Sequence, residues 1–243
     1  FNPPMQLLTK APRNKCLSKG VNTIGFEASN TILAGDNNIV SSNRNALVIG
    51  SAHELESDYT NCSVVGGQRA LISRQGETAL GGGKRTLTQQ DGEDDFTISS
   101  RRQTSTIELA GTTMDNTATN LTVQGMSADE VFNPFINVKP NSIVGYDIYI
   151  TRLELGGSAY VSGNFSYRNI RGAVKVNRTG AMTFYVGFSR NIAKAGQNGT
   201  CIMADTTTGG VPSFSVNVQD RNNVHNLWSA SVTLHEVISE TAF

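Results

Sequence analysis

The sequence is poor in charged residues and has no excess of either sign. Only 16% of its 243 residues are charged, and 20 basic residues balance 20 acidic ones. A chain with this balance lacks the basic surface that attracts nucleic acid or an anionic membrane, so we expect neither as a main partner. No apolar run approaches the roughly 20 residues of a membrane span. Because the chain starts at Phe1, we expect a fragment or a processed product.

The residues that most often carry catalysis or metals are few and badly spaced. Cys16, Cys62 and Cys201 cannot form a complete disulfide framework, and none lies in a CxxC motif. The three histidines are far apart, and no HExxH or GxSxG motif occurs. The adjacent carboxylates Asp94 and Asp95 would point to opposite faces of a strand. We therefore predict no metal, no cofactor and no enzymatic activity.

What the chain does contain is a short repeat between Leu17 and Leu87. Aliphatic residues recur in steps of 7 or 8, with one step of 17 across residues 51–61. Asn often stands two positions before the aliphatic residue, and Gly often stands three positions after it. A fixed period of this kind is typical of a stacked architecture. The predicted inward anchors are Leu17, Ile24, Ile32, Ile39, Leu47, Val64, Ile72, Leu80 and Leu87.

Each unit of the repeat predicts one short strand and one tight turn. Asn tolerates a left-handed turn, and Gly takes turn conformations that a Cβ would penalise. Two units form a coil of 15 residues, which predicts a parallel β-roll, a β-helix-like fold. Residues 51–61 carry several acidic side chains and predict a loop inserted on one face of the roll.

The whole chain is predicted to be all-β, in four parts. Residues 1–14 form an extended lead-in, residues 15–93 the β-roll, and residues 94–130 an intertwined β shaft or linker. Residues 131–243 form an antiparallel, jelly-roll-like β-sandwich, because several segments alternate apolar and polar residues between turn signals. The clearest inward sets are Val144, Tyr146, Ile148 and Ile150; Met182, Phe184, Val186 and Phe188; Phe214, Val216 and Val218; and Trp228, Ala230, Val232 and Leu234.

Two sets of segments resemble known families. The repeats NTILAGDNNIV, NALVIG and NCSVVGG resemble the β-roll heads of trimeric bacterial adhesins, and similar repeats occur in phage tail fibres and appendages. The segments VKPNSIVGYDIYITRLELGGSAYVSG, IRGAVKV and VPSFSVNVQD resemble the distal β-sandwich of phage tail fibres, tailspikes and neck appendages. The resemblance implies a homotrimeric receptor-binding tip on a virion, with other tail proteins upstream. Its partner would be a host cell-surface polysaccharide or an outer-membrane receptor.

Two alternatives stay open from the sequence. The chain could be the non-catalytic distal part, used for trimerisation and carbohydrate binding, of a polysaccharide-degrading tailspike. It could also be the head of a bacterial trimeric adhesin. In each case a glycan site would combine an aromatic face with Asn, Asp and Arg side chains on loops held by rigid strands. The candidate binding residues are Tyr160, Tyr167, Arg168, Asn169, Asn191, Asn198, Asp220, Asn222 and Asn223.

Overall fold

The computed structural model describes residues 15–16, 21–25, 28–56, 58–89, 96–123 and 133–239. Strands and their connections account for all of these residues, which confirms the all-β prediction. No helix suited to crossing a membrane occurs in the described ranges. The predicted lead-in 1–14, the predicted anchor Leu17 and the Asp94–Asp95 pair lie outside them, and the side chain of Leu87 is not described.

The chain divides into two compact units. The first comprises residues 1–106 with residues 236–243, and the second comprises residues 107–235. Strands β10 (Phe96–Thr113) and β19 (His225–Ser239) each contribute residues to both units. The domain limits that the sequence suggests differ from this division and stay predictions.

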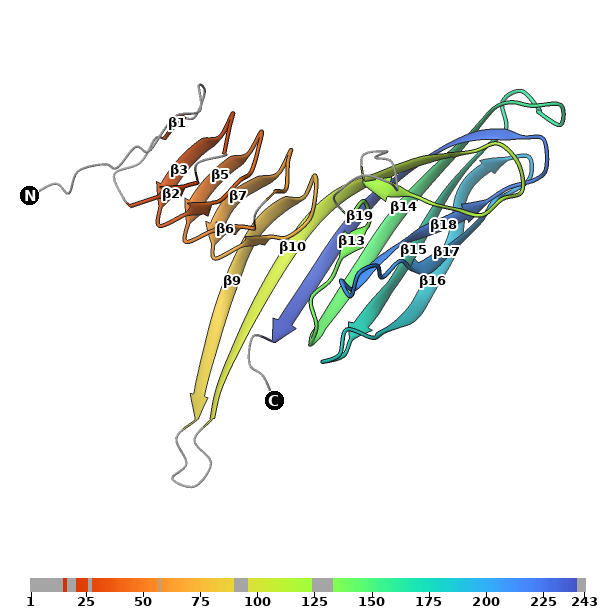
Figure 1. Cartoon of the computed structure of the whole chain (residues 1–243). Coiled ribbons are helices and arrows are strands. Elements are labelled where there is room, and N and C mark those ends of the chain that lie inside the picture. The colour runs from red at the N-terminus through yellow and green to blue at the C-terminus, as the bar shows by residue number, and fades with distance from the viewer. Residues whose placement is uncertain are drawn as a thin grey trace, which may run out of the picture. The chain divides into compact units, whose positions relative to one another are not determined.

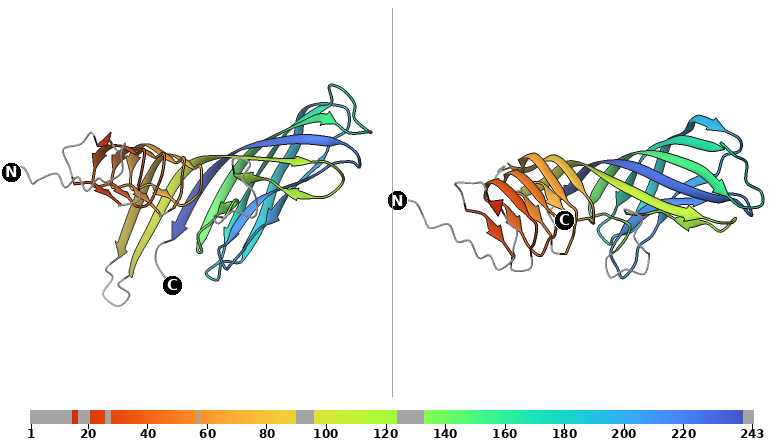
Figure 2. Two further views of the ribbon diagram at one scale, coloured as in Figure 1. Left: turned by 45° about the horizontal axis from the view of Figure 1, so that its top comes forward. Right: turned by 90° about the horizontal axis from the view of Figure 1, so that it is seen from above.

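The first unit is a parallel β-solenoid whose coils stack on one another (Figures 1 and 2). Each coil contributes one strand to each of two sheets, and the strands of neighbouring coils pair in parallel. One sheet contains β1 (Lys15–Cys16), β3 (Ile32–Asp36), β5 (Leu47–Ser51), β7 (Ser63–Gln68) and the start of β9 (Thr78–Gln89). The other contains β2 (Thr23–Ile24), β4 (Ile39–Val40), β6 (Glu54–Leu55) and β8 (Leu71–Ile72).

The interior of the solenoid holds a different column of residues from the one predicted. Val64 and Ile72 are fully buried, as expected, but Ile32 and Ile39 are 45% and 46% exposed and Leu80 also faces outward. Ile24 packs against the core, as predicted, whereas at Ile32, Ile39 and Leu47 the inward residue is the one that follows the predicted anchor. The prediction was therefore wrong by one residue there, and with period-2 strands such a shift exchanges the two faces. The completely buried column is Leu33, Val40, Val48, Leu55, Val64, Ile72 and Ala79.

Residues 51–56 and 58–61 belong to a regular coil, which corrects the prediction of an inserted loop. They contain strand β6, and Leu55 within it is fully buried. Counted on the buried column, Leu33 to Val48 spans 15 residues, Val48 to Val64 spans 16, and Val64 to Ala79 spans 15. The acidic side chains of this segment therefore belong to a coil of nearly the same length as the coils next to it.

Left-handed backbone conformations mark the two corners of each coil. One corner is built from Asn30, Asn45, Asn61 and Gly76, and the other from Asn37, Ala52 and Arg69, all at positive φ. At Asn30, Asn37 and Asn45 the structure confirms the predicted use of Asn in left-handed turns.

A set of polar side chains ends the solenoid at its last coil. The side-chain amide of Gln103 accepts a hydrogen bond from the N–H of Leu71 at 2.8 Å. It also donates one to the carbonyl oxygen of Leu71 at 2.9 Å. The Gln103 side chain thus makes the two hydrogen bonds to Leu71 that the backbone of a further coil would make. Next to it the buried guanidinium of Arg74 binds Glu77 at 2.9 Å and Glu236 at 2.7 Å. Burial raises the pKa of Glu77, although the charge of Arg74 acts in the opposite direction.

The second unit is built from antiparallel sheets around one apolar core. The core confirms most of the predicted alternation, including all four residues of the Val144 and Trp228 sets. The Met182 set is different, because Val186 and Phe188 are exposed on the edge strand. One sheet contains β10, β19, β14 (Ser142–Gly156), β15 (Phe165–Val176) and β16 (Met182–Ala195), with β12 (Thr122–Val123) paired to β10. The other contains β11 (Thr119–Asn120), β18 (Ser213–Gln219), β13 (Ile136–Asn137) and β17 (Thr200–Asp205).

Candidate functional site

The inward face of strand β14 changes from apolar to charged near its end. Ile148 and Ile150 belong to the core, and the next two inward positions are Arg152 and Glu154. Both charged side chains are buried. A buried charge is costly unless it is paired and hydrogen-bonded, so this end of the unit must supply partners.

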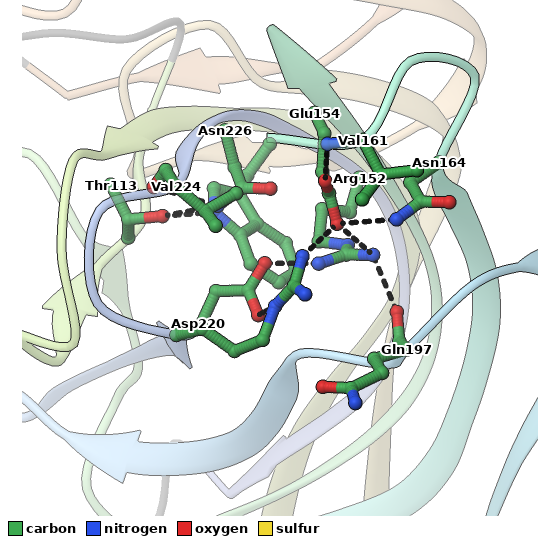
Figure 3. A network of polar contacts seen from close by, with 11 residues as sticks. Thr113, Arg152, Glu154, Val161, Asn164, Gln197, Asp220, Val224 and Asn226 are labelled. Carbon is green, nitrogen blue, oxygen red and sulfur yellow. Dashed lines mark hydrogen bonds and ion pairs between the residues drawn. The ribbon is translucent and has the colours of Figure 1, made fainter. Parts of the chain in front are cut away.

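Arg152 finds its partners on three other segments (Figure 3). Its guanidinium forms a buried ion pair with Asp220 and a second, at 3.3 Å, with Glu154. It also donates a hydrogen bond to the carbonyl oxygen of Gln197 at 2.5 Å. The guanidinium carbon lies 6.0 Å from the centre of the Trp228 ring. Arg152 thereby ties the segments around residues 197 and 220 to the end of β14.

Glu154 fixes the loop that follows β14. One carboxylate oxygen accepts hydrogen bonds from Asn164 at 3.2 Å and from Arg221 at 2.7 Å. The other accepts one from the N–H of Val161 at 3.2 Å. The backbone of the same loop also meets the loop after residue 220, because Ala159 N–H donates to the carbonyl oxygen of Asn223 at 3.0 Å.

The connection after β10 is attached to the same end. The indole N–H of Trp228 donates to the hydroxyl of Thr113 at 2.9 Å, and the side-chain amide of Asn226 donates to it at 3.3 Å. The side-chain amide of Gln219 donates to the carbonyl oxygen of Asn116. Four connections are therefore fixed around one buried group of side chains.

We name the exposed residues of these connections the loop surface: residues 114–118, 157–163, 196–198 and 222–223. Their side chains are mostly amides and hydroxyls, with Tyr160 exposed by 39%. The one charged residue among them is Asp115, and hydrogen bonds from Thr117 hold its pKa below the ordinary value. Arg221, 31% exposed at its side chain, stands at the edge of the surface. A surface of this chemistry can accept and donate hydrogen bonds and can stack an apolar ring face.

Five of the nine predicted binding residues meet at this place. Tyr160, Asn198, Asn222 and Asn223 lie on the loop surface, and all four are exposed. Asp220 lies directly beneath it, buried in its ion pair with Arg152. The structure therefore brings together residues from three separate connections that the sequence could only name one by one.

The other four predicted residues lie on strands β15 and β16. Asn169 is buried and donates to Asp147 and to the carbonyl oxygen of Ile148. Tyr167 stacks on Tyr149, with ring centres 5.8 Å apart. The other two, Arg168 and Asn191, bind each other: the guanidinium of Arg168 donates a hydrogen bond to the side-chain oxygen of Asn191 at 3.1 Å. None of the four belongs to the loop surface, and their role in binding stays a prediction.

Sequence reasoning missed the residues that build the site from below. Arg152 and Glu154 continue the inward register of the Val144 set, so an alternating strand that ends with charges at inward positions was the available signal. Trp228, predicted to face inward, is fully buried, and the guanidinium of Arg152 lies over its ring. The contribution of Gln197 comes from its backbone carbonyl and leaves no trace in the side-chain pattern.

No group of three or more His, Cys, Asp and Glu that could hold a metal lies within the described residues. The thiols of Cys62 and Cys201 are free and buried. Burial raises the pKa of Cys62 to about 12 and that of Cys201 to about 11, so both stay protonated near neutral pH.

No protein-family model and no curated protein matches the chain. Two solved structures resemble it. One is the tailspike protein gp49 of the Acinetobacter baumannii bacteriophage Fri1, a capsular polysaccharide depolymerase, with 8% identity, a TM-score of 0.27, and coverage of 91% of this chain and 37% of that one. The other is the tailspike protein of the Acinetobacter phage vB_ApiP_P1, with 8% identity, a TM-score of 0.25, and coverage of 91% and 47%. The chain thus spans less than half the length of either.

This comparison corrects one expectation. The sequence led us to expect no enzymatic activity, whereas the first of these structures is described as a capsular polysaccharide depolymerase, which is an enzyme. The expectation is withdrawn.

Proposed function

We propose that this chain is part of a tailspike-like protein of a phage virion, and that its loop surface attaches to polysaccharide on the surface of a bacterium. The observation that carries the proposal is the buried group around Arg152. It holds an exposed tyrosine and several exposed amides from separate connections in one fixed arrangement. A binding site needs this support, because its contact residues must be held in place by the layer beneath them.

Sugar recognition fits the side chains of the loop surface. Tyr160 offers an aromatic face to the C–H face of a sugar ring, and Asn198, Asn222 and Asn223 can donate to and accept from its hydroxyls. A single hydrogen bond contributes only about 0.5–1.5 kcal/mol net, so one such surface binds weakly. Several copies on one particle would engage a repeating polymer together and raise the avidity.

The virion form is proposed to be a homotrimer, in which further copies of this chain cover apolar surface that a single copy leaves exposed. On the β3–β5–β7–β9 sheet of the solenoid, Ile49, Val65 and Leu80 are 41%, 48% and 53% exposed. Ile49 and Val65 are paired in register, and Leu80 holds the next place along the solenoid. An uncharged stripe along an axis is complementary to itself in a cyclic assembly around that axis.

The second unit carries a similar feature on the face of its sheet that points away from the core. Leu153 and Phe165 are paired across β14 and β15, and both are exposed. Leu155 on β14 and Leu227 on β19 occupy the same face, because Glu154 and Asn226, which precede them on their strands, are buried on the other face. Exposed apolar side chains gathered on one face mark an interaction site, and we assign them to the same neighbouring copies.

The attachment proposal is tested by binding of purified chain to capsular and O-antigen polysaccharides. We expect Tyr160→Ala and Asn222→Ala to weaken binding about tenfold each, which corresponds to about 1.4 kcal/mol. Tyr185→Ala is the matched control, because Tyr185 is an exposed aromatic residue on β16, outside the loop surface. Wild-type affinity in both loop variants would contradict the proposal. Release of reducing ends in the same incubations measures cleavage by the chain.

The trimer is tested by light scattering of the purified chain. Val65→Glu places a charge in the solenoid stripe and is expected to reduce the trimer to single copies. Ile39→Glu is the matched control, because Ile39 is about equally exposed but lies on the other sheet of the solenoid. A stable single copy of the wild-type chain would contradict this part of the proposal.

A further inference from the structure

We infer that the polysaccharide bound at the loop surface is built from uncharged sugars, such as hexoses and acetamido sugars, rather than from sugar acids. The inference rests on the function proposed above and narrows its ligand class. It follows from the distribution of charge at one end of the second unit.

The loop surface contains no cation of its own. None of its four segments includes a lysine or an arginine. Its exposed polar groups are the amides of residues such as Asn198 and Asn222, the hydroxyls of serine and threonine, and the phenol of Tyr160. These groups match hydroxyl and acetamido substituents, which both donate and accept hydrogen bonds. A sugar carboxylate, which only accepts, would meet no cationic partner in these segments.

The guanidinium at the edge of the surface is already neutralised. Arg221 donates to Glu154 at 2.7 Å, and its Nε lies 3.7 Å from Asp220. Together with Arg152, this group contains two cations and two carboxylates, so its formal charge is zero. A carboxylate from a ligand would meet a guanidinium whose charge Glu154 and Asp220 already balance.

Displacement of Glu154 is opposed by its other contacts. Its carboxylate is buried and also accepts hydrogen bonds from Asn164 and from the N–H of Val161. Removal of one partner from a buried pair leaves an uncompensated charge, which is strongly unfavourable. Arg221 is therefore a positioning residue for the loops, and its charge is already compensated within the protein.

The remaining charge on the surface is Asp115, a carboxylate. The hydrogen bonds from Thr117 favour its ionised form. Its sign repels an acidic polymer, and its effect on a neutral one is small. Binding without an ion pair also predicts little dependence on salt, because screening acts on Coulomb attraction.

The experiment uses the full chain and a panel of bacterial polysaccharides in two groups, neutral polymers and polymers that contain uronic acids. Each acidic polymer is measured again after chemical reduction of its carboxyl groups to primary alcohols. We expect binding within the neutral group, and at least tenfold tighter binding to a carboxyl-reduced polymer than to its acidic parent. The affinity should change less than about twofold between 50 and 500 mM NaCl.

Three results would overturn the inference. Tighter binding to the acidic parent than to its reduced form would contradict it while leaving attachment to polysaccharide in place. Tenfold weaker binding at high salt would do the same. Failure of every polymer, acidic, reduced or neutral, to bind would overturn both the inference and the proposed function.

Discussion

The two units solve the same problem, polar groups in a folded interior, in opposite ways. In the solenoid, neutral side chains form a ladder along the coils. Asn22 accepts a hydrogen bond from the N–H of Asn38, Asn38 from that of His53, and His53 from that of Ala70. In the second unit, charged side chains gather once, around Arg152, at the end that carries the loops. In a regular repeat, neutral side chains can satisfy the buried backbone groups of every coil in the same way. A site that joins unrelated loops needs stronger contacts, such as charge-assisted hydrogen bonds, between residues far apart in the sequence.

The one buried ion-pair group described within the solenoid unit supports this view. Arg74, Glu77 and Glu236 lie at the last coil, where no further coil can supply hydrogen bonds. In both units, therefore, buried charge is found where a regular pattern stops. Substitutions in both faces of the solenoid and at its last coil test how far this contrast holds.

Arg74→Met should lower the free energy of unfolding of the first unit by about 3–5 kcal/mol, because it leaves Glu77 and Glu236 buried without their cation. Urea unfolding followed by circular dichroism measures the change. Arg44→Met is the control, since Arg44 is exposed on the solenoid and its substitution should cost less than about 0.5 kcal/mol. Equal effects of the two substitutions would show that the buried ion pairs contribute nothing particular at the last coil.

Val40→Ala and Ile39→Ala compare the two faces of one strand of the solenoid. Val40 is fully buried and Ile39 is 46% exposed, so the first should cost about 2 kcal/mol and the second less than about 1 kcal/mol. Thermal unfolding of the two variants side by side measures the difference. The reverse order would restore Ile39 as the inward anchor and would undo the register described above.

This pair of residues also shows why the sequence predicts the second unit better than the first. Alternation with period two separates the inward Val144 set from its polar neighbours. In the solenoid, Ile39–Val40 and Leu47–Val48 each offer two adjacent aliphatic residues, and both columns keep the same period. The choice between them depends on packing with the coils on either side, which the sequence does not display.

The site was predictable to a similar extent. Exposed loop residues such as Tyr160 and Asn222 follow from turn signals and side-chain chemistry. Arg152 and Glu154 did not follow, because charged residues are almost never fully buried unless paired, and their partners Asp220 and Arg221 lie far along the chain. The sequence indicates which residues could contact a ligand, and the long-range ion pairs determine which of these residues lie together in the fold.

His53→Asn tests whether the ladder depends on its side chains being neutral. Burial lowers the pKa of His53, so the folded state favours the neutral ring, while the unfolded chain takes up a proton near pH 6.5. The stability that depends on the neutral ring is present above about pH 6.5 and is lost as the pH falls. We expect the wild-type chain to lose about 1 kcal/mol more than the Asn variant between pH 8 and pH 5, measured by urea unfolding.

The His53→Asn variant should keep the hydrogen bonds of the ladder at neutral pH. Nδ1 of His53 accepts a hydrogen bond, so the proton of the neutral ring is on Nε2, which is buried. In the preceding coil the side-chain amide of Asn38 donates to the carbonyl oxygen of Gly50. An asparagine at position 53 can repeat that contact one coil further on. A parallel pH dependence in the two proteins would contradict the assignment of His53 as the titrating group of the ladder.

Ala52→Asn has the smallest expected effect and tests the corners of the coils. Ala52 has a φ of 55°, as the corner residue Asn37 has a φ of 57° one coil earlier. This conformation is uncommon for residues other than Gly, Asn and Asp, so alanine is strained there and asparagine is not. We expect the variant to be more stable by about 0.5–1 kcal/mol, seen as a higher urea midpoint with an unchanged slope. Ala46→Asn is the contrasting substitution, because Ala46 is buried beside the core and an amide there should destabilise the solenoid. If both substitutions destabilised the chain to the same degree, packing of the small side chain would determine which residue occupies the corner. The left-handed backbone conformation would then not favour asparagine at this position.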